Sequence, residues 1–153
     1  MNQFQKILLA ISKVFSLFTP APRLSGAYQV GMYQGMVFSA IAHETFENAS
    51  IKFWDRKWYT TSMEEWGKIF ANVLMEMPAY ISNKFDCDNY AFYTSALVSA
   101  RFKLNTCGVA SGKNSEGQAH AFNIFFSEGK FHILEPQTGD IDPDYTVKQI
   151  DFW

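Results

Sequence analysis

Apolar residues spaced three or four positions apart predict helices in the first half of the chain. Residues 1–18 show this spacing, and Pro20 ends it. We expect an amphipathic helix there that packs on the body of the protein or on a second copy, with a membrane-surface or export role as the alternative. The stretch is too short to cross a bilayer, which needs about twenty apolar residues. A second helix is predicted over residues 33–46.

Two further helices carry clear signals at their N-termini. Ser62 and Glu65 form a capping box, and the helix that they begin ends before Pro78. Residues 54–59, just before it, are interpreted as a short aromatic connector. The next helix is predicted over residues 88–103, where the apolar positions again follow helical spacing.

Alternating apolar and polar positions then replace the helical spacing, which predicts β-strands. We expect strands over residues 106–110, 118–127 and 130–137, with the last two joined by a turn at residues 128–129. Residues 138–153 are interpreted as an acidic tail. The predicted fold class is therefore α+β, with N-terminal helices followed by a small antiparallel sheet.

The two-residue turn fixes the register of the last two strands. Ser127 then lies opposite Lys130, and His120 lies opposite Gln137, with Glu135 as its diagonal neighbour on the more apolar face. Polar groups at the end of a buried face need partners. One interpretation is structural: a hydrogen bond between His120 and Glu135 satisfies the polar groups at the end of the sheet. The other is catalytic: Glu135 holds His120 in one tautomer so that it can act as a base.

Composition and charge exclude several classes of function. The chain has 153 residues, of which 48% are apolar and 18% charged, as expected for one globular domain over residues 1–153. A net charge of −2 gives no basic field for nucleic acid. Two cysteines are too few for a disulfide scaffold, although a bond between them stays open, as does the compartment.

Cys87 is the residue with the clearest chemical potential. It lies at the start of a predicted helix, where the helix dipole favours a thiolate. Asp86 and Asp88 oppose that charge unless a cation neutralises them. A cysteine at a helix start, followed by a strand histidine and a carboxylate, is the order of papain-like and transglutaminase-like thiol enzymes. The alternative is a small buried hydrophobic residue, which is our interpretation of Cys107.

Three sequence blocks resemble a known family. They are Asp86-Cys87-Asp88-Asn89-Tyr90-Ala91, Gly117-Gln118-Ala119-His120-Ala121-Phe122-Asn123 and Glu135-Pro136-Gln137-Thr138-Gly139. Together they are similar to the papain-like C-terminal domain of the fungal Marasmius oreades agglutinin and its relatives. The similarity covers residues 55–140 and leaves residues 1–50 as a helical N-terminal extension.

The resemblance implies a papain-like cysteine peptidase that acts on a peptide or protein substrate. In that family pattern Cys87 is the nucleophile, His120 the general base and Glu135 the group that orients it, while Gln137 assists. The family enzyme is activated by calcium, which makes the oxygen-bearing side chains of the two residues beside the nucleophile, Asp86 and Asp88, its expected ligands.

Two alternatives to a peptidase use the same framework. A transglutaminase-like acyl transferase or an amidase would employ the same three residues, Cys87, His120 and Glu135. An inactive relative would be a binding or assembly module that forms homo-oligomers through the N-terminal helix. No transmembrane span is expected in either case.

Overall fold

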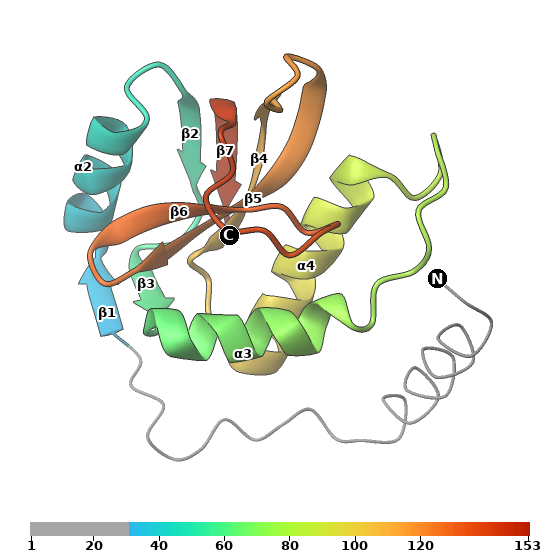
Figure 1. The fold of residues 1–153 in the computed structure, drawn as a ribbon. Coiled ribbons are helices and arrows are strands. Elements are labelled where there is room, and N and C mark those ends of the chain that lie inside the picture. The colour runs from blue at the N-terminus through green and yellow to red at the C-terminus, as the bar shows by residue number, and fades with distance from the viewer. Residues whose placement is uncertain (1–30) are drawn as a thin grey trace.

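The computed structural model describes residues 31–153 (Figure 1). The helix predicted over residues 1–18 lies outside the described residues. Within them, no helix is both long and apolar enough to cross a membrane.

A five-stranded mixed sheet forms the centre of the fold (Figure 1). The strands lie in the order β2 (Ser50–Phe53), β7 (Thr146–Phe152), β4 (Cys107–Lys113), β5 (Ala119–Ser127) and β6 (Lys130–Leu134). β2 and β7 are parallel, and the other neighbours are antiparallel. A separate antiparallel pair joins β1 (Gly31–Gln34) to β3 (Lys57–Thr60).

Helices cover both faces of the central sheet. α2 (Gly35–Thr45) packs on one face, and α3 (Met63–Leu74) and α4 (Cys87–Phe102) pack on the other (Figure 1). The α+β class predicted from the sequence is therefore confirmed. The prediction of a small, purely antiparallel sheet is wrong, because the sheet has five strands and includes a parallel pair.

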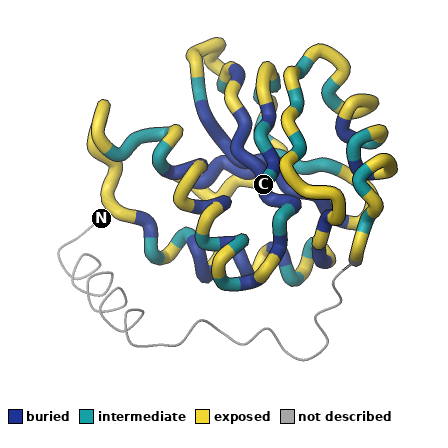
Figure 2. The backbone as a smooth tube through the Cα atoms, turned by 180° about the vertical axis from the view of Figure 1, so that it is seen from behind, coloured by how far each residue is buried: buried dark blue, intermediate teal, exposed yellow. Residues whose placement is uncertain are grey.

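The register predicted for the last hairpin is confirmed. Ser127 pairs with Lys130, and the pairing continues to Asn123 opposite Leu134, where β6 ends. Phe122, Ile124 and Phe126 of β5 point toward α2, whereas Phe125 packs with α3 and α4. Both faces of β5 are thus buried, which explains its nearly continuous apolar sequence. Figure 2 shows that buried residues concentrate in these strands.

An aromatic cluster between α2 and the sheet holds this side of the fold together. Phe38 of α2 is fully buried and stacks on Trp58 of β3 at 4.6 Å between ring centroids. It also contacts four phenylalanine rings at 5.1–5.9 Å, which belong to Phe53, Phe126, Phe131 and Phe152. These contacts fix the position of β3 relative to α2.

The predicted helices begin close to the expected residues. Ser62 caps α3, since its side chain accepts a hydrogen bond from the Glu65 N–H at 3.4 Å. Asp86 and Asn89 form a reciprocal capping box at the start of α4. The helix predicted over residues 33–46 begins two residues later, because Tyr33 and Gln34 pair with β3 instead.

Two segments were predicted wrongly. The supposed connector over residues 54–59 contains the start of β3, and the supposed acidic tail contains β7, which lies inside the sheet between β2 and β4. Only Ile150 and Phe152 of β7 are buried, and its polar residues are mostly exposed. Its three apolar residues, Val147, Ile150 and Phe152, are spaced by three and then two positions, so no regular alternation marks the strand.

Candidate functional site

A polar cluster closes the open end of the β5–β6 hairpin. A hydrogen bond of 2.5 Å joins His120 Nε2 to Glu135 Oε2, and the Tyr145 hydroxyl donates to the same oxygen at 3.0 Å. The other carboxylate oxygen, Oε1, accepts from the backbone N–H of Gln137 at 2.9 Å. The structure therefore brings His120 and Glu135 together, as expected for diagonal neighbours. The predicted strand over residues 130–137 ends at Leu134 instead, so Gln137 does not pair with His120 and contacts Glu135 only through its own backbone N–H.

The Tyr145 hydroxyl is a constant hydrogen-bond donor in this cluster. Burial, and then the hydrogen bond to Glu135, raise the pKa of Tyr145 to about 12. The hydroxyl consequently stays protonated near neutral pH and donates to the buried carboxylate. Its ring contacts both His120 and Phe122, at 5.5 and 5.2 Å between centroids. The sequence pattern gave no sign of Tyr145, because it lies in the segment interpreted as a tail.

Cys87 is not a member of this hydrogen-bond network. It is the first residue of α4 and packs on the small side chains of Ala91, Val109 and Ala121. Ala121 points to the opposite face of β5 from His120, because side chains alternate along a strand. Among the described residues, no hydrogen bond or ion pair joins Cys87 to His120 or Glu135.

Asp86 and Asp88 interact with each other at the start of α4. Their mutual hydrogen bond is the main reason that the pKa of Asp88 is raised and that of Asp86 lowered. Asp86 also accepts the Asn83 backbone N–H at 2.9 Å. Within residues 31–153, no three acidic, histidine or cysteine side chains gather as metal ligands. Calcium at this place would take most of its six to eight oxygens from backbone or water.

The two cysteines are expected to differ in reactivity. Both are free thiols, but Cys107 is buried and Cys87 is half-buried. Burial raises the pKa of Cys107, so its thiolate is scarce as well as inaccessible. We expect iodoacetamide at pH 8 to label Cys87 and spare Cys107, as measured by peptide mass spectrometry.

Unfolding in concentrated urea provides the control for this experiment, because both cysteines should then be labelled equally. Equal labelling in the folded protein would contradict the described burial of Cys107.

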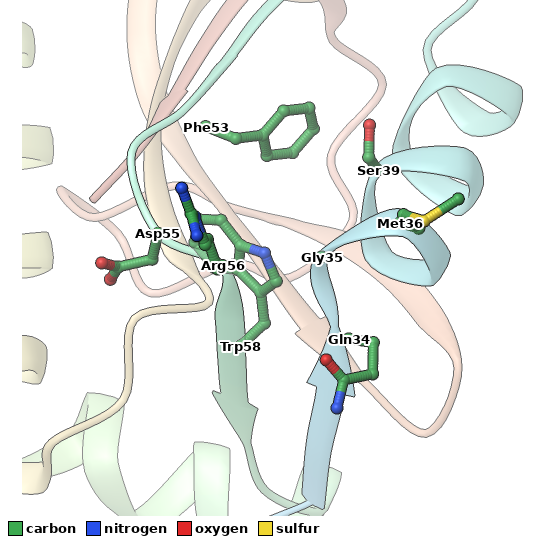
Figure 3. Close-up of a pocket in the computed structure, with 8 residues that line it drawn as sticks. All are labelled: Gln34, Gly35, Met36, Ser39, Phe53, Asp55, Arg56 and Trp58. Atoms are coloured by element: carbon green, nitrogen blue, oxygen red, sulfur yellow. The ribbon is translucent and has the colours of Figure 1, made fainter.

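A cavity of about 630 Å³ lies beside the start of α2, and we call it the α2 cavity. Its lining combines aromatic, polar and charged side chains from β1, α2, β2, β3 and the β2–β3 connection (Figure 3): Gln34, Gly35, Met36, Ser39, Phe53, Asp55, Arg56 and Trp58. The volume is within the range of small-molecule sites, about 300–1,000 Å³.

The aromatic wall of the α2 cavity is rigidly held. Trp58 is fully buried, stacks on Phe38 and meets Phe53 edge-on at 5.8 Å. At the rim, a hydrogen bond joins the start of α2 to the β2–β3 connection: the Gly35 N–H donates to the Arg56 carbonyl at 2.9 Å. An added Cβ on Gly35 would lie only 3.0 Å from that oxygen, so glycine allows this close approach.

Sequence reasoning missed the α2 cavity. Its residues come from two short segments that meet only because β1 pairs with β3. Neither segment contains a recognised motif. The one available signal was the density of aromatic residues over 53–59, of which residues 54–59 were predicted to be a connector.

Comparison with known proteins gave matches only to solved structures. No model of a protein family and no curated protein matches the sequence. The PSL1a–E64 complex matches with a TM-score of 0.67 and 22% identity, over 79% of this chain and 51% of that chain. Polyporus squamosus lectin bound to the human-type influenza-binding epitope Neu5Acα2-6Galβ1-4GlcNAc matches with a TM-score of 0.65 and 21% identity. That match covers 79% of this chain and 49% of the lectin chain.

These matches show a shared fold. This chain spans about half the length of either matched chain.

These findings overturn the family and activity assigned from the sequence. A structure that shares the fold is described as a lectin, and no family or curated sequence supports a papain-like cysteine peptidase. The cysteine-hydrolase prediction is wrong on this comparison, and the binding-module alternative is closer to the neighbours. The individual roles of Cys87, His120, Glu135 and Gln137, and of Asp86 and Asp88 toward calcium, stay predictions.

Proposed function

We propose that this chain is a carbohydrate-binding module and that the sugar binds in the α2 cavity. The observation that carries the proposal is the composition of the cavity wall. Two aromatic rings, Phe53 and Trp58, lie beside hydrogen-bonding side chains of Gln34, Ser39 and Arg56. A sugar ring presents apolar C–H groups on one face and hydroxyls at its edge, so it needs such a mixture of aromatic and polar groups.

The preformed shape of the cavity also favours ligand binding. Trp58 is held from behind by Phe38, so the aromatic wall does not have to be ordered when a ligand arrives. Binding to a preorganised wall avoids much of the entropy cost of association. The carbohydrate named with the Polyporus squamosus lectin supports the same class of ligand, although the match covers only 49% of that lectin chain.

Filling the α2 cavity is expected to weaken sugar binding. Ser39→Phe places a ring in the cavity, whereas Ala40→Phe adds the same ring at the exposed next position of α2. A glycan array identifies a binding sugar, and isothermal titration calorimetry then measures its affinity. We expect Ser39→Phe to weaken binding at least tenfold, about 1.4 kcal/mol, with Ala40→Phe unchanged.

Two results would contradict the proposal. One is a folded protein that binds no glycan on the array. The other is binding that Ser39→Phe and Ala40→Phe leave equally intact, because the sugar would then occupy a different surface.

A further inference from the structure

The sheet face opposite α2 carries exposed side chains over β2 and β7. On the α2 side, Phe53 and Phe152 are register partners, and their rings stack at 5.9 Å between centroids. Side chains alternate along a strand, so the residues on either side of these two project to the other face. α4 packs on that face over β4 and β5, for example through Ala91 and Val109. Five side chains of β2 and β7 on this side form what we call the β2–β7 face: Lys52, Trp54, Gln149, Asp151 and Trp153.

Two tryptophans mark one end of the β2–β7 face. Trp54 continues β2, because its N–H donates to the Phe152 carbonyl at 3.1 Å, and its side chain is 73% exposed. Trp153 follows Phe152 in β7, so the two indoles project from neighbouring strands about 4.8 Å apart. The ring of Phe92 in α4 stacks on Trp153 at 5.9 Å between centroids. The face therefore presents one exposed indole beside a second indole that α4 supports.

A hydrogen-bonding network without net charge lies next to the tryptophans. Asp151 Oδ2 accepts from Gln149 Nε2 at 2.7 Å, and Asp151 Oδ1 lies 3.7 Å from Lys52 Nζ. Pairs at the surface contribute little to stability, so these groups can exchange their partners for those of a ligand. The charges of Lys52 and Asp151 cancel, which favours an uncharged ligand over a polyanion or a polycation.

We infer that the β2–β7 face binds an uncharged glycan chain. This second site goes beyond the proposed function and does not depend on the α2 cavity. A sugar ring would pack its C–H groups on Trp54, while its hydroxyls exchange hydrogen bonds with Gln149, Asp151 and Lys52.

The length of the face favours a chain over a single sugar. From Gln149 to Trp153 the strand is about 13 Å long, at roughly 3.3 Å per residue, which exceeds one sugar ring. A protein partner fits this face less well, because Lys52 and Asp151 lie within it and the centres of protein interfaces are depleted of charged residues.

The test uses two uncharged β-1,4-linked probes, cellohexaose and the N-acetylglucosamine hexamer of chitin. Each is titrated into the full chain by isothermal titration calorimetry. We expect at least one to bind, and Trp54→Ala to weaken that binding at least tenfold. Trp54→Phe keeps an aromatic ring and should retain most of the affinity. Tyr80→Ala is the matched control, because it removes a 53% exposed aromatic side chain from the α3–α4 connection, and it should leave binding unchanged.

The possible results separate this inference from the proposed function. Binding that Trp54→Ala weakens and Ser39→Phe leaves intact would support the β2–β7 face and place that glycan outside the α2 cavity. Binding that Ser39→Phe weakens and Trp54→Ala leaves intact would overturn the inference and support the α2 cavity. If neither hexamer binds, the inference is wrong, and a dimer that Trp54→Ala dissociates in light scattering would then assign the face to a second copy.

Discussion

Gly112→Ala is expected to lower the free energy of unfolding by more than about 3 kcal/mol. Gly112 lies at the bulge where the register between β4 and β7 shifts. A Cβ at this position would lie 1.7 Å from the Thr146 carbonyl oxygen, which is backbone and cannot rotate away. The central strands would therefore have to separate. Urea denaturation followed by circular dichroism measures the effect.

Gly67→Ala is the matched control for this substitution. Gly67 is an exposed residue of α3, and an added Cβ would meet no atom within 4 Å. Alanine is a better helix former than glycine, so Gly67→Ala should raise stability by about 0.5–1 kcal/mol. If both variants changed stability by similar amounts, the close approach of β4 and β7 at Gly112 would be contradicted.

Phe38→Ala is expected to cost about 3–5 kcal/mol, the usual range for a buried phenylalanine. The side chain is fully buried and contacts five aromatic rings, so its removal leaves a cavity between α2 and the sheet. Trp58 also loses the ring stacked behind it. We therefore expect weaker ligand binding at the α2 cavity together with a lower midpoint of thermal unfolding.

Phe92→Ala controls for the loss of an aromatic side chain as such. Phe92 is 54% exposed and makes a stacked contact with Trp153 at 5.9 Å. Its loss should cost less than about 1 kcal/mol. Comparable losses for Phe92→Ala and Phe38→Ala would mean that the aromatic cluster around α2 does not stabilise the fold as described.

The parts of the fold that could be predicted from sequence are those governed by local rules. The Ser62 cap and the helical spacing that follows predicted α3, and the two-residue turn at residues 128–129 fixed the register of β5 and β6. β1, β2 and β3 have only four residues each, which is too short for alternation to be distinguished from chance.

Of the candidate sites, one follows from local rules in the sequence and the other depends on contacts between distant segments. The neighbourhood of His120 and Glu135 followed from the hairpin register, since both residues belong to adjoining strand ends. The α2 cavity could not be predicted, because its walls are brought together by the pairing of β1 with β3 across the intervening β2. Tyr145 reaches Glu135 from the connection before β7, which no local pattern marks.

The parallel pairing of β2 with β7 also means that β2 cannot join the sheet until β7, near the end of the chain, has been synthesised. β2 (Ser50–Phe53) has no other strand partner within the described residues, so its edge stays unpaired until the ribosome has added residues 146–152. At about 5–20 residues per second, that interval lasts roughly 5–20 s. During this time the nascent chain exposes Ile51 and Phe53 along an open strand edge. A translational pause in the second half of the message would lengthen this exposure and favour capture by chaperones or aggregation.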